Sequence, residues 1–435
     1  MKTKIFLIII GMGLLFSVRA GDGQFQLIEV DSPVQTDSHG YVPNMLLAKP
    51  KLRLLNLASM QSDLLRQFPR EIKSTFYDDR IGYEVIELAS GQNAEEAKSQ
   101  LQNTGAFSEV WFNYKVRITE TTPNDEYFKY QYSLKNTGQF VDNNKTYSGA
   151  TGADIKATDG WDWATGSEST VIAVIDTGVA VGHEDLQSKV VSGYNFIDNS
   201  TQIQDDNGHG TFVASVAAAE TNNSKGMSGV CWKAKIMPLK TMNSKGDGDL
   251  YQLALAIRYA AEHGAKVINM SLGGKNDTPY LKEACQYAVS KGCVLVASTG
   301  NDHAQVLFPA AYDDYCLAVG ATDANDQVAS FSNFGPEVDV VAPGVWIVGA
   351  LFNPKDPTDL RHYAYGDGTS YAAPFVSGAA ALLLSYKPSL TPAQVMNMIR
   401  YTADDVNKTT YPGKDVYMGY GRINLKTLLS PYILQ

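Results

Sequence analysis

The chain has 435 residues, of which 44% are hydrophobic and 19% charged, and its formal net charge at pH 7 is -10. At about 100–200 residues per domain, this length predicts two or three folding units with a sizeable core. The acidic balance and the lack of a basic cluster argue against nucleic acid as a partner. An acidic surface is compatible with calcium or basic peptides but identifies neither.

The first twenty residues have the pattern of a secretory signal peptide. Lys2 and Lys4 give a positive start, residues 5–16 form an apolar run, and residues 18–20 (Val-Arg-Ala) place small residues where a signal peptidase reads them. A membrane anchor is the alternative, but the run is shorter than the ~20 residues that a span needs. We therefore expect a secreted protein, extracellular or periplasmic, with no membrane span after signal removal.

The four cysteines have no zinc-site spacing. An oxidising destination permits disulfides. However, Cys293 and Cys316 lie in apolar, strand-like runs, which favours buried free thiols at least as much as a bridge. The pairing therefore stays open. The four residues are Cys231, Cys285, Cys293 and Cys316.

The first part of the chain after the signal predicts a small α+β unit within residues 21–120. Alternating apolar residues indicate strands, and a polar, proline-containing stretch at 119–125 is typical of an exposed linker. The expected elements are strands over 51–57, 82–88 and 110–116 and a helix over 94–101.

From about residue 165 the pattern changes to short, wholly apolar runs that alternate with amphipathic helices. Such runs predict a parallel sheet covered by helices on both faces, an α/β doubly wound fold. Functional groups in such sheets gather beyond the carboxyl ends of the strands. The expected strands are 171–175, 267–270, 294–298, 317–321 and 338–342; the expected helices are 210–219, 250–262, 279–291, 370–385 and 392–400.

Three polar residues have positions that suit amide hydrolysis, which needs a nucleophile, a base and a group to orient the base. Ser370 opens a long apolar helix, His209 opens a helix of small residues between two glycines, and Asp176 ends a buried strand. Each has a simpler interpretation, as an N-cap serine, a surface-loop histidine or a turn aspartate. Together, at strand ends and helix starts, they are much more specific.

The segments around these residues resemble the signature blocks of the subtilisin-like serine proteases, in that family's order of Asp, His and Ser. They are VIAVIDTGV (171–179), NGHGT (207–211) and GTSYAAPFVSGAAALL (368–383). The resemblance covers about residues 125–430, and TPNDEYFKYQYSLKNTG (122–138) is most similar to the thermitase branch. It implies a three-layer, doubly wound, mainly parallel sheet.

The resemblance also implies roles for the three residues and for a fourth. Asp176 would orient His209, and His209 would take the proton of Ser370 and return it to the leaving amine. Asn301 matches the family's oxyanion-hole asparagine, which acts with the Ser370 N–H. The implied activity is a serine endopeptidase that works through an acyl-enzyme.

Two segments resemble the edges that hold an extended substrate by β-augmentation. A third resembles the floor of the first specificity pocket, where a leucine replaces a small residue and would make the pocket shallower. The residues concerned are Ser271, Leu272 and Gly273 on one edge, Gly246 and Gly248 on the other, and Leu307 in the pocket.

A structural calcium ion is implied by the thermitase-like pattern. Asp125 and Asp185 match two carboxylate ligands, and Asn223 matches a loop ligand. Six oxygen ligands suit Ca²⁺, and a polar loop without metal is the alternative. The carbonyls that would complete the shell are those of Glu220, Lys225 and Met227.

The unit before residue 121 resembles the family's inhibitory pro-region, which assists folding and then inhibits the peptidase domain of residues 121–435. Autocleavage would fall near 117–123, and a permanent accessory domain is the alternative.

A catalytically silent, peptide-binding or chaperone-like protein would use the same groove, but the intact polar residues favour an enzyme acting on proteins or peptides. A lipase or esterase is disfavoured, because the motif around the nucleophile and the order of the three residues in the chain differ from those of that class.

Overall fold

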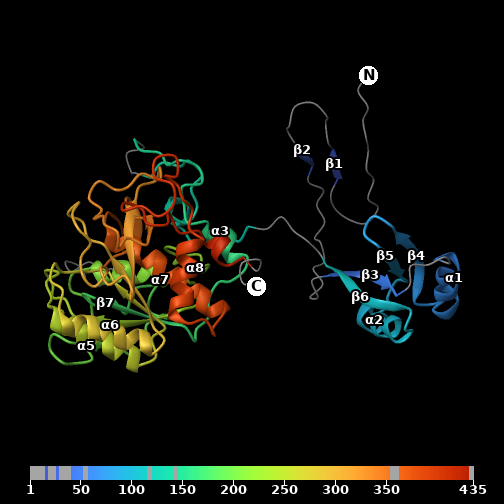
Figure 1. Cartoon of the computed structure of the whole chain (residues 1–435), viewed down its shortest axis with the longest axis horizontal. Helices are drawn as coiled ribbons and strands as arrows, with labels where there is room; N and C mark the ends of the chain where they lie inside the picture. The colour runs from blue at the N-terminus through green and yellow to red at the C-terminus, as the bar shows by residue number, and fades with distance from the viewer. Residues whose placement is uncertain are drawn as a thin grey trace, which may run out of the picture. The chain divides into compact units, whose positions relative to one another are not determined.

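The computed structural model describes residues 15–17, 26–28, 41–51, 57–114, 120–141, 146–352 and 362–430. The chain forms two compact units, Met1–Ile118 and Thr119–Gln435 (Figure 1). Most of the predicted signal peptide, residues 1–20, lies outside the described residues. Strand β1 (Leu15–Ser17) pairs antiparallel with β2 (Gln26–Ile28).

The first unit has a four-stranded antiparallel sheet of order β4-β5-β3-β6 with two helices. Its core gathers Leu46, Ile86, Leu101 and Val110 from both layers. The elements are β3 (Tyr41–Pro50), α1 (Leu57–Gln67), β4 (Ile72–Asp78), β5 (Tyr83–Leu88), α2 (Ala94–Asn103) and β6 (Phe107–Tyr114).

The strand expected over 51–57 falls mostly on residues 52–56, which lie outside the described residues, and its two described ends are not in a strand. The central strand β3 ends at Pro50, which has no backbone N–H to continue the ladder, and α1 begins at Leu57. Burial of Leu46 and Ala48 between β5 and β6 fixes the register of β3.

The second unit is built on a seven-stranded sheet of order β13-β12-β11-β10-β7-β9-β8, whose pairs are all parallel. This confirms the predicted α/β, doubly wound, mainly parallel fold. The strands are β7 (Val171–Asp176), β8 (Tyr194–Asn195), β9 (Lys235–Lys240), β10 (Val267–Met270), β11 (Val294–Ser298), β12 (Cys316–Thr322) and β13 (Val340–Pro343).

Helices cover both faces of this sheet and create two hydrophobic cores. On β7, Ile172 and Val174 enter one core and Ala173 and Ile175 enter the other, as expected where side chains alternate along a strand. Helices α4 (His209–Ala218), α7 (Thr369–Tyr386) and α8 (Pro392–Tyr401) supply the first core, and α5 (Leu250–Glu262) and α6 (Pro279–Ser290) supply the second (Figure 1).

Smaller elements complete the second unit. A two-stranded antiparallel ribbon of β14 and β15 precedes α7 in the chain. The bounds are η1 (Phe128–Tyr130), α3 (Ala157–Trp161), β14 (Ile347–Ala350), β15 (Tyr363–Gly366) and α9 (Leu425–Leu428).

All four cysteines are buried free thiols. Burial raises the pKa of the Cys231 and Cys293 thiols to about 11, which keeps them protonated and unreactive near neutral pH. Among the residues that the structure describes, no helix is long and apolar enough to cross a membrane.

Candidate active site

Asp176 and His209 meet at the carboxyl end of the central strand β7. Asp176 is fully buried, and its Oδ1 lies 2.8 Å from Nδ1 of His209, the first residue of α4. The same Oδ1 accepts the backbone N–H of Thr177 at 2.8 Å. A buried carboxylate is costly without partners, and these two donors offset part of that cost at Oδ1 and fix the orientation of the imidazole ring.

The two glycines that flank His209 allow this approach. Gly208 has a φ of 110°, a conformation that side chains other than glycine rarely adopt. A Cβ on Gly210 would lie 2.2 Å from the carbonyl oxygen of Gly178 and 3.1 Å from Cβ of Asp176. Only glycine therefore lets α4 begin this close to the end of β7.

Asp205 is a buried positioning residue that sequence reasoning missed. Its Oδ1 accepts the Thr177 hydroxyl and the backbone N–H groups of Asn207 and Gly208, at 2.9–3.0 Å. Its Oδ2 accepts both the N–H and the hydroxyl of Thr211. This carboxylate caps the start of α4 and ties it to the residue after Asp176. An aspartate four residues before the histidine is the signal that could have found it.

The electrostatic setting of His209 favours a moderately basic imidazole. Burial lowers its pKa, but the charge of Asp176, the hydrogen bond to Asp176 and the charge of Asp205 more than offset this effect. The net result is a pKa above the ordinary value of 6.5. The ring therefore binds a proton readily, as a base must.

Ser370 is the second residue of α7 and exchanges two hydrogen bonds with Ser271, which follows β10. Ser271 Oγ donates to the carbonyl oxygen of Ser370 at 2.7 Å, and Ser370 Oγ donates to the carbonyl oxygen of Ser271 at 3.1 Å. Pro374 lies four residues after Ser370 and has no N–H for the helical bond to its carbonyl. That carbonyl is therefore available to Ser271.

The Ser370 hydroxyl lies on the same side of the sheet as His209. Ser271 and His209 line one pocket of about 350 Å³, and the ring of Tyr371, the next residue along α7, lies 5.5 Å from the His209 ring between centroids. His209 thus lines this pocket together with Ser271, Asp176 lies buried behind His209, and the Ser370 hydroxyl donates to the Ser271 carbonyl.

Asn301 is exposed after β11, and its side-chain oxygen is held from behind. Thr369, which is fully buried, donates both its N–H (2.9 Å) and its hydroxyl (2.8 Å) to Asn301 Oδ1. With Oδ1 engaged in this way, the Nδ2 group lies beside Gly368, where an added Cβ would be 3.5 Å from it. Thr369 is a second positioning residue that sequence reasoning missed, although it lies inside the Gly-Thr-Ser motif.

All the predicted substrate residues except Leu307 line two adjoining pockets, each of about 350 Å³. The pocket beside His209 is lined by Ser271, Leu272, Gly273 and Gly246. The next pocket shares Leu272 and Gly273 and adds Gly248 together with apolar side chains of α5. We call these two pockets the groove, and residues 242–248, which contribute to both, the edge segment.

Leu307 lies apart from these pockets, against the backbone that ends them. A Cβ added to Gly273 would lie 2.9 Å from Cβ of Leu307, and a Cβ added to Gly300 would lie 2.8 Å from Cδ1 of Leu307. Leu307 therefore fills the space between the Gly273 and Gly300 backbones. Gly274 and Phe308 pair beside it in an antiparallel bridge.

The predicted calcium residues also come together. Asn223 lies between the two buried acids: its N–H donates to Asp125 Oδ1 and its Nδ2 to Asp185 Oδ1, both at 3.1 Å. Met227 and Lys225 direct their N–H groups to Asp185 Oδ2 and Asn223 Oδ1, at 2.8 Å each. Glu220 bonds to the Asp185 carbonyl through its N–H.

The acids fit a hard cation in charge and in donor type. Burial raises the pKa of Asp185 to about 6, and the Asp125 charge adds to this rise, so a dication would relieve both effects. Within the described ranges no group of three or more His, Cys, Asp or Glu side chains is arranged to hold a metal. A cation would rest on two carboxylates plus amide and backbone oxygens, and Asn223 would have to present oxygen where it presents nitrogen here.

Comparison with known proteins identifies the family. Residues 167–421 match the Subtilase family (peptidase S8). The chain is 43% identical over 349 residues to the thermophilic serine proteinase of Bacillus sp. (strain AK1), covering 80% of this chain and 78% of that protein. It is 42% identical over 271 residues to thermitase of Thermoactinomyces vulgaris, covering 62% and 91%.

A solved structure agrees. A protease of Pseudoalteromonas arctica (strain PAMC 21717) superposes with a TM-score of 0.61 at 27% identity, covering 71% of this chain and 99% of that one. The chain belongs to the subtilase family. It is a subtilisin-like serine endopeptidase, and its substrates are proteins or peptides.

Proposed function

We propose that this protein is a secreted endopeptidase that cleaves peptide bonds through an acyl-enzyme on Ser370, and that it is made as a precursor. The observation that carries the proposal is the 2.8 Å bond between Asp176 and His209, beside a groove whose wall residue Ser271 is bonded to Ser370. The basic pattern and apolar run of residues 1–20 support secretion.

The proposed reaction has two halves, acylation and deacylation. The Ser370 hydroxyl turns from Ser271 toward Nε2 of His209, gives it the proton, and Oγ attacks the peptide carbonyl carbon. The C–N bond then breaks as Nε2–H protonates the leaving amine. Water next attacks the acyl carbon, again giving its proton to Nε2, and the carboxylic acid leaves as Ser370 regains its proton. Asp176 stabilises the imidazolium in both halves.

The oxyanion of each tetrahedral intermediate would be held by the Nδ2 group of Asn301 and the backbone N–H of Ser370. The two hydrogen bonds that Thr369 donates to Asn301 Oδ1 support this assignment, because they fix the orientation of the amide before the substrate binds.

Asn301→Leu is therefore expected to lower kcat by about 100- to 1000-fold with little change in KM, since the oxyanion forms only in the transition state. Steady-state kinetics on a peptide p-nitroanilide measure both constants. Thr369→Val is the graded control: it removes one of the two bonds to Oδ1 and should cost less than Asn301→Leu. A normal kcat in Asn301→Leu would refute the assignment.

The first unit would act as an intramolecular inhibitor and folding assistant until it is cut off near residues 117–123. The division of the chain at Ile118 and Thr119 is compatible with a cleavable joint there. Two exposed aromatic side chains, Phe76 and Trp111, share one face of its sheet and offer an apolar surface to a partner.

Calcium would be held by Asp125 and Asp185 with Asn223 and the carbonyls of Glu220, Lys225 and Met227. A dication there would lower the cost of burying two carboxylates and brace the loop of residues 220–227. It would take no part in the chemistry.

Chelation by EDTA is expected to lower the melting temperature by about 5–10 °C, the shift that corresponds to binding at roughly 100 times Kd. Differential scanning calorimetry with and without calcium measures it. The matched control is Asp185→Asn, in which EDTA should have no further effect. An unchanged melting temperature of the wild type in EDTA would remove the calcium proposal.

The test of the proposed function is a fluorophosphonate probe, which labels an activated serine. We expect one adduct per molecule, found by mass spectrometry on the peptide that contains Ser370, and loss of peptide hydrolysis in step with labelling. Hydrolysis that survives full labelling of Ser370, or an adduct elsewhere, would overturn the proposal.

A further inference from the structure

Lys240 is a buried cation next to the groove that the mechanism above does not use. It is the last residue of β9, lies opposite Asp176 in the β7–β9 register, and is only 4% exposed. A buried ammonium is unfavourable unless its N–H groups all find acceptors. Solubility accounts for charges on the surface, so this buried charge needs another explanation.

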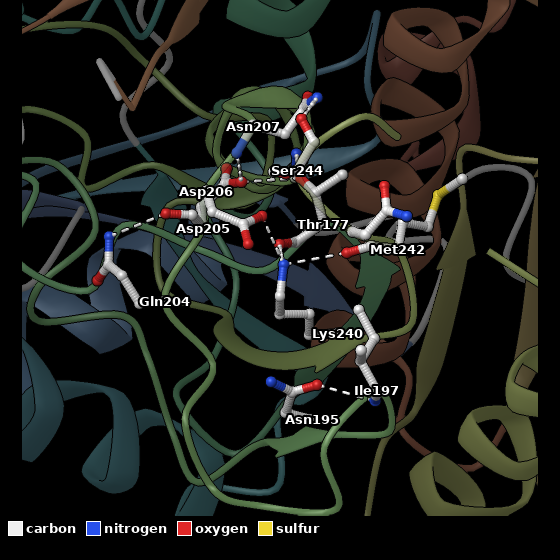
Figure 2. Close-up of polar contacts among 12 residues, drawn as sticks. Thr177, Asn195, Ile197, Gln204, Asp205, Asp206, Asn207, Lys240, Met242 and Ser244 are labelled. Atoms are coloured by element: carbon white, nitrogen blue, oxygen red, sulfur yellow. Dashed lines mark hydrogen bonds and ion pairs between the residues drawn. The ribbon is translucent and has the colours of Figure 1, made fainter. Parts of the chain in front are cut away.

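The ammonium has three N–H donors and three acceptors. Figure 2 shows Lys240 Nζ bonded to the carbonyl oxygen of Thr177, to Asp206 Oδ1 at 2.7 Å and to the carbonyl oxygen of Met242 at 3.0 Å. Two of the three acceptors are backbone atoms. The side chain therefore fixes main-chain positions as well as pairing with a carboxylate.

Each acceptor belongs to a different part of the proposed site. Thr177 follows Asp176, donates its N–H to the Asp176 carboxylate and accepts the N–H of Gly210 in α4. Asp206 lies in the loop that leads to His209. Met242 opens the edge segment and lines both pockets of the groove. One ammonium thus contacts the residue after Asp176, the loop before His209 and the edge segment.

A second link runs between the same loop and the edge segment. Asn207 Nδ2 donates to the carbonyl oxygen of Ser244 at 3.0 Å (Figure 2). Asn207 Oδ1 accepts the N–H of His209 at 3.2 Å. The loop before His209 and the edge segment are therefore braced at two points, and Lys240 is the buried one.

Lys189 provides an internal comparison. It is also almost completely buried, at 2% exposed, and its Nζ donates to the carbonyl oxygen of Trp232. Trp232 lines neither pocket of the groove. A buried lysine as such is thus not tied to the site. In contrast, two acceptors of Lys240, Thr177 and Met242, line the groove, and the third, Asp206, precedes Asn207, which also lines it.

We propose that Lys240 is a positioning residue for peptide-bond cleavage. Its ammonium fixes the position of the edge segment relative to Asp176 and His209. In that position the edge segment can pair with an extended substrate. The inference rests on the proposed function, because it assigns Lys240 to the same groove. Without the ammonium, the carbonyls of Thr177 and Met242 lose their partner and the edge segment is free to shift.

The test compares Lys240→Met with Lys189→Met, with rates expressed per active site titrated by the fluorophosphonate probe. For a tetrapeptide p-nitroanilide, which reaches the edge segment, we expect Lys240→Met to raise KM about 10-fold and to lower kcat/KM by up to about 100-fold. For a single-residue ester, which does not reach it, KM should change less than about twofold. Lys189→Met should lower stability and leave the constants of both substrates unchanged.

Two further variants keep the proposal testable if Lys240→Met does not fold. Lys240→Arg should recover most of the loss, because a guanidinium can donate to the same acceptors. Asp206→Ala removes a half-exposed partner and should raise the tetrapeptide KM by a few fold only. Unchanged tetrapeptide kinetics in both Lys240→Met and Asp206→Ala, or equal effects on the ester and the tetrapeptide, would overturn the proposal.

Binding in a Ser370→Ala background separates this proposal from the proposed function. Titration calorimetry with an uncleaved tetrapeptide should show affinity about 10-fold weaker when Lys240→Met is added. If the wild type hydrolyses nothing, the proposed function fails while this affinity still tests Lys240. If the wild type hydrolyses peptides and the affinity is unchanged, only the Lys240 proposal fails.

Discussion

Replacement of Ser370 by alanine is expected to reduce kcat for peptide hydrolysis by about 10⁶-fold, the scale known for the same removal in subtilisin. The reason is chemical: alanine has no oxygen to form the acyl bond, while His209, Asn301 and the groove keep their positions. Steady-state assays on a peptide p-nitroanilide, with the fluorophosphonate probe in parallel, measure the loss. Ser370→Ala should also bind peptide with nearly normal affinity.

Ser385→Ala is the matched control for Ser370→Ala. Ser385 lies near the other end of α7, and its hydroxyl donates to the carbonyl oxygen of Ala381 at 2.7 Å. Its removal should lower stability by about 1 kcal/mol at most and leave kcat unchanged. The precursor offers a second measurement, since the Ser370→Ala chain should stay uncut near residues 117–123. Normal maturation or hydrolysis by Ser370→Ala would contradict the account.

Asp176→Asn is expected to lower kcat by about 10⁴-fold. Asparagine keeps the shape of the side chain but loses its charge, so it neither stabilises the imidazolium nor holds the His209 tautomer that leaves Nε2 free to accept a proton. The control is Asp339→Asn. Asp339 is another fully buried carboxyl of the same unit, paired with Arg400 at 2.7 Å. It should affect stability and not kcat per active site.

The pH dependence tests the same pair. His209 must be neutral to accept a proton, and its pKa lies above 6.5, so wild-type kcat/KM should fall as pH drops through that raised value. Asp176→Asn removes the main cause of the rise and leaves burial, which lowers the pKa. The residual activity should therefore persist to lower pH than in the wild type. An unshifted profile would contradict the assigned contact.

The sequence predicts the sheet well where strands are continuous apolar runs. The runs 171–175, 267–270 and 294–298 match β7, β10 and β11 within one residue, because strands buried on both faces need apolar side chains throughout. Strand β9 was missed because Pro238 interrupts it between flanking lysines. The neighbouring β8 pairs only with Leu239 and Lys240, so the missing N–H is tolerated.

Some residues of the candidate site could be predicted from the sequence and others could not. Asp176, His209 and Ser370 lie in short local motifs, so the sequence alone identifies them as candidates. Asp205, Thr369 and Lys240 act through contacts to groups far away in the chain, such as the bond from Lys240 to Thr177, 63 residues away. No spacing rule encodes the contact between Lys240 and Thr177, because it depends on how β7, β9 and the loop before α4 are brought together.

The most direct test of the central claim is a crystal structure of the protein after reaction with a peptidyl phosphonate, which imitates the tetrahedral intermediate. The account predicts phosphorus bonded to Ser370 Oγ, a phosphonyl oxygen about 2.7–3.1 Å from Asn301 Nδ2 and Ser370 N, and His209 Nε2 within about 3.2 Å of Oγ. The peptide should lie along the edge segment. An adduct on another residue, or His209 out of reach of Oγ in the adduct, would contradict it.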